Sequence, residues 1–446
     1  MDVIRLRLSA WLGSSAMTRL VKNTSLLLSA EVLVSAIGFA RFLLITHALD
    51  DDYGVWMLVS SAVAVISQII AVRLWETVIK YVSEFMVVGD EARLLALIKL
   101  CLLIDLVVAI LVFVAVAISA NWLSLVFLKR PDLGALFLAE AVRICVKTGL
   151  SVWVALLRVF DRFKWLSLNN VLTSAAWFVL SLVVLELGLG VAGLIVAGVI
   201  INAAQTIMLL VLAGRELRTR FRGHWLTANL SALRGRGREI GGMLFSMNVD
   251  SFRKIILNGA DTLVLGYFYT AAEVTVYEYA MQLTAYLARL TQPIYDSLYP
   301  EVTRVYAAEG PAPVRVLVRK LTIGLTVIFG GLLAGTYLFS WWLIPLIFPK
   351  YAPAIPIFSI TVLTNLWIIG LWAPSLMVAA GRARQFTVYN TISALVMLIM
   401  LLVLTPLWGS VGTAIATVSY YVVWMLTVYP AALKILARPS AGAAGV

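Results

Sequence analysis

Ionisable side chains stand within long apolar stretches of this sequence, where they are suited to binding phosphate groups or carrying an ion. A Lys or Arg at the centre of a membrane helix costs about 2.5–3.5 kcal/mol on insertion scales, so each requires water, a ligand or a charged partner. We predict that the basic residues contact a substrate and that the carboxylates are candidates for ion coupling. The basic residues are Arg41, Arg143, Lys147, Arg253, Lys254 and Arg289, and the carboxylates are Glu31, Glu140, Asp250 and Glu278.

Helical spacing predicts that these side chains share faces. Glu140, Arg143 and Lys147 follow i, i+3 and i+7, so they fall within about 60° of one another on a helix. Similar spacing gives a polar face to each of the segments 24–48, 240–268 and 272–296. Four such helices, two from each half of the chain, predict a hydrated central cavity.

A second interpretation is that these charges form ion pairs that hold helices together without a ligand, for example Glu140 with Arg143. This ion-pair interpretation remains an alternative for each of these residues considered individually. Carboxylates in the cavity leave room for a coupling proton or sodium ion, and no other cofactor is expected. The two histidines and the two cysteines do not have the spacing of metal ligands, so no metal site is predicted.

Composition places the helices in a membrane. Hydrophobic residues make up 62% of the 446 positions and charged residues 13%, which excludes an ordinary soluble protein. A helix needs about 20 largely apolar residues to cross the hydrocarbon. We therefore expect an all-α, polytopic membrane protein with about twelve transmembrane helices, at 24–48, 53–73, 94–118, 134–157, 166–186, 190–213, 240–268, 272–296, 321–348, 354–379, 386–406 and 410–432.

A basic linker divides these segments into two groups of six. Residues 214–239 hold seven arginines, which are hard to translocate, so the linker is predicted to be cytoplasmic. Trp225, Leu226, Leu230 and Leu233 recur at helical spacing, which predicts an amphipathic helix on the inner leaflet; a solvated loop and direct binding of lipid phosphate are the alternatives. The expected parts are a cytoplasmic N-terminal segment 1–23, an N-lobe 24–213, the linker 214–239, a C-lobe 240–432 and a cytoplasmic tail 433–446.

Loop charges agree with this topology. With both termini in the cytoplasm, 25 of the 35 Lys and Arg residues lie inside, and only Lys129, Arg130 and Lys350 lie in outer loops. The net charge of +12 thus follows the positive-inside rule and does not form a basic groove. Nucleic acid is not an expected partner.

Several functions are excluded by what the loops lack. No loop has the size of a soluble domain, and no Gly-x-x-x-x-Gly-Lys-Ser/Thr segment is present, so neither an outer catalytic domain nor a nucleotide-driven pump is expected. Two six-helix halves joined by one linker are typical of transporters that open alternately to the two sides of a membrane. We therefore predict a transporter and not an enzyme.

Motifs in both halves resemble one family. Gly38-Phe39-Ala40-Arg41 and Tyr53-Gly54-Val55-Trp56 resemble the opening of the O-antigen or oligosaccharide flippases, polysaccharide transporters of the multidrug/oligosaccharidyl-lipid/polysaccharide exporter superfamily. In the second half, the run from Asp261 to Phe268, the segment ending at Tyr277, and the residues 297–300 and 306–310 match the family's order and spacing. The similarity covers about residues 17–432. Asp50 and Thr275 depart from it, where glycines are common in the family.

The resemblance implies that the chain moves undecaprenyl-diphosphate-linked oligosaccharide from the cytoplasmic to the periplasmic leaflet of a bacterial inner membrane. It also implies a polysaccharide polymerase and glycosyltransferases as functional partners, and we expect a monomer. Two alternatives remain. One is a cation-coupled exporter of small organic cations from the drug-efflux branch of the superfamily. The other is a membrane-embedded transferase or polymerase acting on the same lipid.

Overall fold

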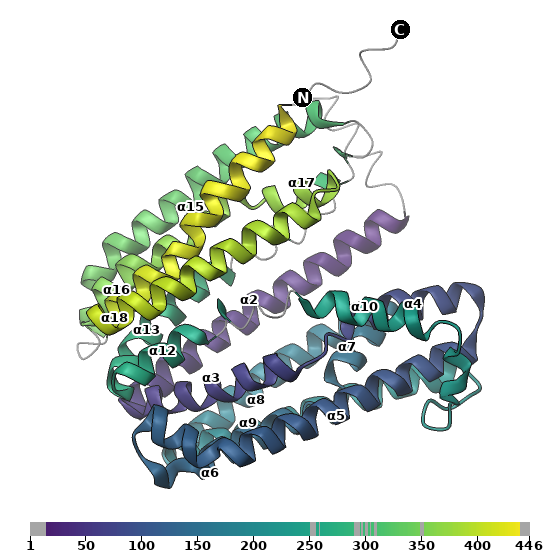
Figure 1. Ribbon diagram of the computed structural model, residues 1–446, viewed down its shortest axis with the longest axis horizontal. Coiled ribbons are helices and arrows are strands. Elements are labelled where there is room, and N and C mark those ends of the chain that lie inside the picture. The colour runs from purple at the N-terminus through teal and green to yellow at the C-terminus, as the bar shows by residue number, and fades with distance from the viewer. Residues whose placement is uncertain are drawn as a thin grey trace. The chain divides into compact units, whose positions relative to one another are not determined.

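The computed structural model describes residues 15–249, 256–257, 259–289, 310–347 and 352–437, with isolated positions between 295 and 306. Side chains are described from residue 32 to residue 244 and, with a few exceptions, over the later ranges. Every regular element in these ranges is a helix (Figure 1). Eight of these helices are long and apolar enough to cross a membrane, and the last of them covers two of the predicted segments.

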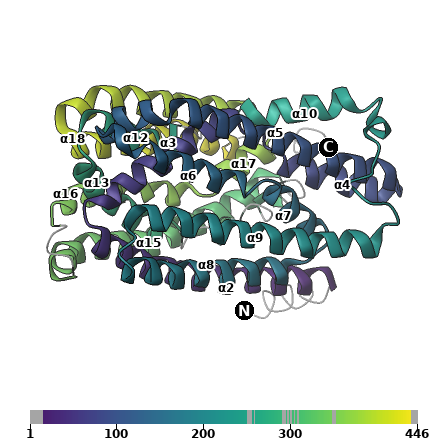
Figure 2. The ribbon, with the colours of Figure 1, turned by 90° about the horizontal axis from the view of Figure 1, so that it is seen from below.

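Helices occupy the first six predicted segments, with one addition and one interruption. The addition is α4 (Trp75–Val88) in the predicted second loop, and the interruption divides segment 134–157 into α6 (Gly134–Cys145) and α7 (Leu150–Val159). Helices α8 (Phe163–Glu186) and α9 (Gly190–Arg220) lie side by side (Figure 2). The bounds of the remaining helices in this half are Ser15–Leu49 for α2, Asp52–Ile70 for α3 and Glu91–Leu123 for α5, and a π-helical turn, Ser124–Leu128, extends α5.

The second half follows the predicted segments as far as it is described. The longest element, α18 (Ala383–Leu436), changes direction at Gly409, whose φ of 57° and ψ of −135° are non-helical, so it contains the last two predicted segments. The other bounds are Gly237–Val249 for α10, Ala260–Phe268 for α12, Ala271–Arg289 for α13, Pro311–Ile347 for α15, Ala354–Thr361 for α16 and Ala373–Ala379 for α17, with a 3-10 helix over Val362–Gly370 between the last two.

The chain separates into two compact units. Within the described chain, unit 1 comprises residues up to Ala48, Ile70–Ala120 and Ala135–Val249, and unit 2 comprises the rest. Most of α3 and the turn after α5 thus group with the second half of the chain. Glycine makes this packing possible, because a Cβ at Gly266 of α12 would lie 2.2 Å from Leu58 Cδ2 of α3. The division into two lobes of six helices stays a prediction.

Each unit has its own apolar core. In unit 1 the core includes Leu94, Ile98 and Leu156, and in unit 2 it includes Trp372 and Leu376, all of them fully or almost fully buried. Large apolar side chains also cover the outer faces of the long helices. Such exposure would be unfavourable in water, whereas a lipid bilayer accepts it, so the surface agrees with a multi-pass membrane protein.

Candidate functional site

An ion pair within α6 is the centre of the polar site in unit 1. Arg143 Nε donates to Glu140 Oε2 at 2.9 Å, and a second guanidinium nitrogen donates to Glu140 Oε1. The Glu140 side chain is 1% exposed, whereas that of Arg143 is 27% exposed. The predicted pairing of these two residues is therefore present, and part of the Arg143 side chain stays accessible.

Helix α8 brings an aromatic ring beside this ion pair, α2 brings a second arginine to that ring, and α9 leaves room for the ring and Arg143. The Arg41 guanidinium of α2 lies 4.9 Å from the ring centroid of Trp177 on α8. A Cβ at Gly198 of α9 would lie 2.8 Å from Arg143 Cδ and 3.0 Å from the Trp177 ring, so the absence of a side chain there admits both groups. We call Arg41, Glu140, Arg143 and Trp177 the cationic cluster.

Lys147 lies in the interruption between α6 and α7, so the prediction of one continuous helix over 134–157 is wrong. Gly149 adopts a φ of +81°, and its backbone N–H donates to Asp105 Oδ2 of α5 at 2.6 Å. The Asp105 carboxylate thus accepts a hydrogen bond from a backbone N–H that would donate to a backbone carbonyl in a continuous helix. The Lys147 side chain is exposed and still interacts electrostatically with Arg143 and Glu140.

Unit 2 contains two buried carboxylates on neighbouring helices. Asp261 of α12 is 6% exposed and Glu278 of α13 is 5% exposed. Tyr277 Oη donates to Asp261 Oδ2 at 2.7 Å and lies 3.1 Å from Thr417 Oγ1 of α18, and the Thr262 hydroxyl donates to Glu278. Among the described residues no Lys or Arg forms an ion pair with either carboxylate. We call Asp261 and Glu278 the carboxylate pair.

Burial makes two negative charges on this pair unfavourable. The desolvation cost of an unpaired carboxylate is several kcal/mol, and two negative charges on the pair would also repel each other. Hydroxyl donors such as those of Tyr277 and Thr262 offset part of this cost. A proton or a bound cation would remove most of the remaining electrostatic cost. This geometry therefore suits a site that binds and releases a cation.

Of the remaining predicted site residues, the structure describes the side chain of Arg289 alone. Arg289 is exposed, and its guanidinium lies 4.8 Å from the Tyr286 ring. Asp250, Arg253 and Lys254 lie outside the described residues, and so does the side chain of Glu31. The convergence of polar faces from both halves of the chain therefore stays a prediction.

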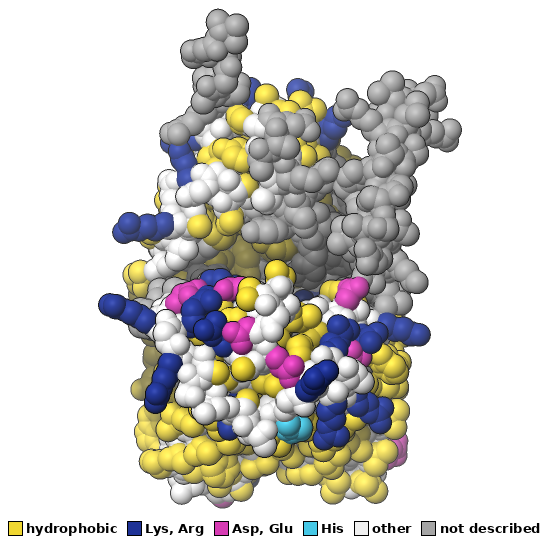
Figure 3. Space-filling model, turned by 90° about the vertical axis from the view of Figure 1, so that its right-hand side faces the viewer, with side chains coloured by type: hydrophobic (Ala, Val, Ile, Leu, Met, Phe, Trp, Pro, Cys, Tyr) yellow, Lys and Arg dark blue, Asp and Glu magenta, His cyan; other side chains and the backbone are white. Residues whose placement is uncertain are grey.

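The linker is held against α4 and α5 by its arginines and carbonyl groups. Arg236 donates to Glu84 at 2.8 Å and to Glu239 at 2.6 Å, and Tyr81 donates to Glu239 at 3.1 Å. The Lys99 ammonium donates to the carbonyl of Ala228 at 3.0 Å. Figure 3 shows basic and acidic side chains intermixed on this end of the molecule.

These contacts shift the pKa values of Glu239 and Tyr81. The hydrogen bond from Arg236 lowers the pKa of Glu239. Burial, and next the hydrogen bond to Glu239, raise the pKa of Tyr81 to about 12. Both shifts favour the observed arrangement of a neutral phenol, a carboxylate and a guanidinium.

The predicted amphipathic helix in the linker is wrong. Between 221 and 236 the described backbone forms turns and one short 3-10 helix, Leu230–Leu233. Trp225 packs on Trp153, with ring centroids 5.5 Å apart, and Leu233 is buried in the core of unit 1. Trp225 and Leu233 thus both contact the core of unit 1, whereas Leu226 and Leu230 are exposed.

Comparison with known proteins decides the family. A family model described as polysaccharide biosynthesis protein matches residues 51–356, well over half of the chain. The chain belongs to the polysaccharide biosynthesis protein family. The predicted resemblance to polysaccharide transporters is confirmed. No match was found among curated proteins.

Solved structures show the fold of this polysaccharide biosynthesis protein. An inward-facing multidrug resistance MATE transporter of the MOP superfamily has a TM-score of 0.68 at 15% identity, over 96% of this chain and 100% of that one. The eukaryotic MATE transporter AtDTX14 gives 0.60 at 14% identity, over 94% and 96%. The Vibrio cholerae MATE transporter VcmN in its bent form gives 0.54 at 17% identity, also over 94% and 96%. The predicted all-α polytopic membrane fold is confirmed, and it is similar to the fold of these MATE transporters.

Sequence reasoning missed most of the buried site in this polysaccharide biosynthesis protein. Glu278 was a candidate, but Tyr277, Thr262 and Thr417 were not, and Asp261 was only placed on a polar face. The available signal was the pair Tyr277-Glu278 beside Asp261-Thr262, two polar pairs 16 residues apart on helices joined by a short turn. Antiparallel helices joined so closely bring such positions to the same depth.

Proposed function

We propose that this protein moves undecaprenyl-diphosphate-linked oligosaccharide from the cytoplasmic to the periplasmic leaflet of a bacterial inner membrane. The product would supply synthesis of a surface polysaccharide such as O-antigen, capsule or exopolysaccharide. The observation that carries this proposal is the cationic cluster within a chain of the polysaccharide biosynthesis family. Family membership supports the carbohydrate pathway, and the cluster supports an anionic head group.

The cationic cluster has the chemistry that a diphosphate requires. Guanidinium groups donate two parallel hydrogen bonds to phosphate oxygens and stay charged at any physiological pH. Arg143 already makes such a two-point contact with Glu140, so a phosphate could take the place of the carboxylate. Glu140 would then be left buried and unpaired, which links substrate binding to a change in its charge or environment.

Ion coupling is the second part of the proposal. The chain shows no nucleotide-binding motif, so directed transport would draw on a proton or sodium gradient. The carboxylate pair is the preferred site, because it is buried and has no basic partner among the described residues. Glu31, Glu140 and Asp250 stay further candidates. A cation bound on one side and released on the other would bias the alternation of the two lobes.

The alternatives have less support. The similar MATE transporters include multidrug proteins, but at 14–17% identity they share only the fold with this chain. A mobile organic cation would also be repelled by the guanidinium groups of the cationic cluster. A transferase or polymerase would need catalytic carboxylates in an outer domain, and no loop of the sequence is large enough for one.

Reconstitution tests the proposal directly. Purified protein is placed in liposomes that contain a fluorescent undecaprenyl-diphosphate oligosaccharide, and a membrane-impermeant quencher reports which leaflet carries the label. Labelled lipid should become accessible in protein-containing vesicles and not in empty ones. Uptake of a fluorescent organic cation by the same vesicles, without movement of the oligosaccharide, would overturn the proposal in favour of the exporter.

We further propose both termini in the cytoplasm and a monomeric transporter that works beside a polymerase and glycosyltransferases. The charge distribution supports the orientation. The proposed substrate supports these partners, because glycosyltransferases would assemble the lipid-linked oligosaccharide and a polymerase would consume it on the opposite face of the membrane.

A further inference from the structure

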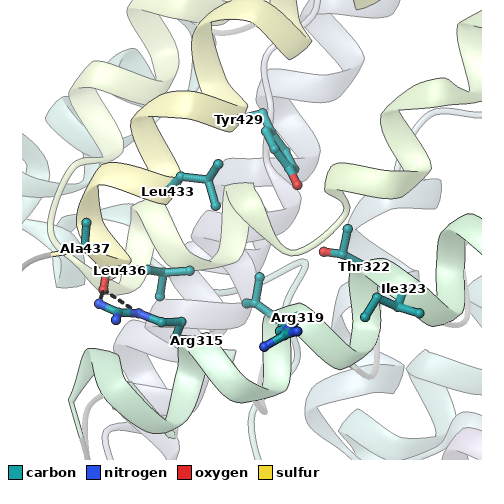
Figure 4. A pocket seen from close by; sticks show the side chains of 9 residues that line it. Arg315, Arg319, Thr322, Ile323, Tyr429, Leu433, Leu436 and Ala437 are labelled. Atoms are coloured by element: carbon teal, nitrogen blue, oxygen red, sulfur yellow. Dashed lines mark hydrogen bonds between the residues drawn. The ribbon is translucent and has the colours of Figure 1, made fainter.

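Unit 2 contains an open pocket between the start of α15 and the end of α18. Its volume is about 490 Å³. Figure 4 shows Arg315 and Arg319 projecting from α15, while Tyr429 and Leu433 project from α18 into the same space. Among the described residues that line it, none is acidic. Neither the cationic cluster nor the carboxylate pair contributes to this pocket.

The two arginines of the pocket differ in their partners. Arg315 Nε donates to the carbonyl oxygen of Leu436 at 3.1 Å, and a second nitrogen of the same guanidinium donates there too. This contact satisfies a carbonyl in the last turn of α18 and positions Arg315. Arg319, one turn further along α15, is exposed and has no hydrogen-bond or ion-pair partner in the described part of the chain. Its guanidinium is available to an anion.

Apolar side chains continue from the pocket along both helices. On α15, Ile323 is 57% exposed and Val327, one turn on, is 70% exposed. On α18, Leu433 is 42% exposed and Leu426, two turns earlier, is 71% exposed. Both pairs lead away from the arginines toward the middle of their predicted transmembrane segments. The surface is thus cationic at one end and apolar along its length.

We propose that this pocket binds the phosphate group of a membrane lipid, with Arg319 as the principal phosphate ligand and the lipid chain along Ile323 and Leu433. Guanidinium groups are well matched to phosphate oxygens, and an apolar stripe beside them selects an amphiphile over a free ion. The positive-inside pattern assigns these helix ends to the cytoplasmic leaflet. Both a glycerophospholipid and a polyprenyl phosphate carry the required chemistry.

Binding is measured by native mass spectrometry and fluorescence titration of the full-length protein in neutral detergent. The probes are phosphatidylglycerol, undecaprenyl phosphate, diacylglycerol as a phosphate-free lipid, and inorganic phosphate. Phosphatidylglycerol or undecaprenyl phosphate should bind, and the tighter of the two identifies the source of the phosphate. Loss of the charge-assisted contact in Arg319→Ala should weaken this binding by about tenfold or more, and Arg319→Glu should abolish it.

A matched control keeps the result specific. Arg384→Ala removes another exposed arginine from the same unit, at the start of α18, and should leave lipid affinity unchanged. Arg319 has no described protein partner, so its variants should keep the wild-type melting temperature. The proposal would be overturned if diacylglycerol bound as tightly as the phosphate-bearing lipids, or if inorganic phosphate alone competed effectively with them. Unchanged lipid affinity in Arg319→Glu would also overturn it. The readout is lipid binding, so it is independent of whether oligosaccharide is transported.

Discussion

The backbone N–H of Gly54 donates to Thr275 Oγ1 at 2.8 Å, across 221 positions of the chain. The same hydroxyl lies 3.1 Å from the carbonyl oxygen of Asp51. A Cβ at Gly54 would lie 1.9 Å from the carbonyl oxygen of Ala271. The N-terminal end of α3 therefore contacts the backbone of α13, and Thr275 supplies the polar contact between them.

Gly54→Ala should destabilise unit 2 by about 3 kcal/mol or more, because the added methyl group meets backbone and not a flexible side chain. Thr275→Val, which removes only the hydroxyl, should cost about 1 kcal/mol. Gly214→Ala is the control, since nothing lies within 4 Å of a Cβ there. Thermal unfolding in detergent measures all three. Equal melting temperatures for Gly54→Ala and Gly214→Ala would contradict the close packing.

Variants of the ion pair between Glu140 and Arg143 in α6 distinguish a role in substrate binding from a purely structural role. Arg143→Ala leaves Glu140 buried and unpaired, which should cost about 3–5 kcal/mol as well as transport. Adding Glu140→Ala should restore most of the stability but not the movement of labelled lipid-linked oligosaccharide in liposomes. Arg143→Lys should restore transport only in part, since it loses the two-point contact. Recovery of full transport in the double variant would show that the pair only holds helices together.

Removing charge from the carboxylate pair should uncouple transport from an ion gradient. Glu278→Gln and Asp261→Asn keep shape and much of the hydrogen bonding, so the protein should fold and move lipid without accumulation against a gradient. The measurement compares the final distribution of labelled lipid with and without an imposed proton or sodium gradient. Asp51→Asn, which changes an exposed carboxylate just before α3, is the control. Wild-type protein that ignores both gradients would exclude ion coupling.

The contact between Tyr81 and Glu239 should make stability depend on pH at the alkaline end. The pKa of Tyr81 is raised from 10.0 to about 12, so the folded state favours the neutral phenol. This stabilisation is complete below pH 10 and disappears as the pH rises toward 12. Tyr81→Phe lacks the titrating group and should show a smaller loss of melting temperature between pH 9 and pH 11 than wild type, as circular dichroism can measure.

Labelling tests the proposed orientation. In a background where Cys101 and Cys145 are replaced by Ala, a membrane-impermeant maleimide added to intact cells should modify Asp51→Cys and spare Arg222→Cys. Both positions are exposed, so accessibility depends on the side of the membrane. Permeabilised cells provide the positive control for the linker position. Modification of Arg222→Cys in intact cells would reverse the topology.

Apolar length and loop charge sufficed to determine the membrane class, the helical segments and their predicted orientation. These properties are local: a segment of about 20 apolar residues needs a helix to satisfy its backbone in lipid, whatever surrounds it. The pairing of Glu140 with Arg143 was predictable for the same reason, because three residues along one helix place both side chains on one face.

Tertiary packing decided the rest. Segment 134–157 is interrupted because Asp105, from another helix, accepts the N–H of Gly149, and helical periodicity contains no sign of that partner. The linker is not an amphipathic helix because groups on α4 and α5 bind its backbone and side chains one by one. Likewise Tyr277 reaches Thr417, 140 positions away. Such contacts depend on which helices become neighbours, a relationship that spacing along a single helix does not contain.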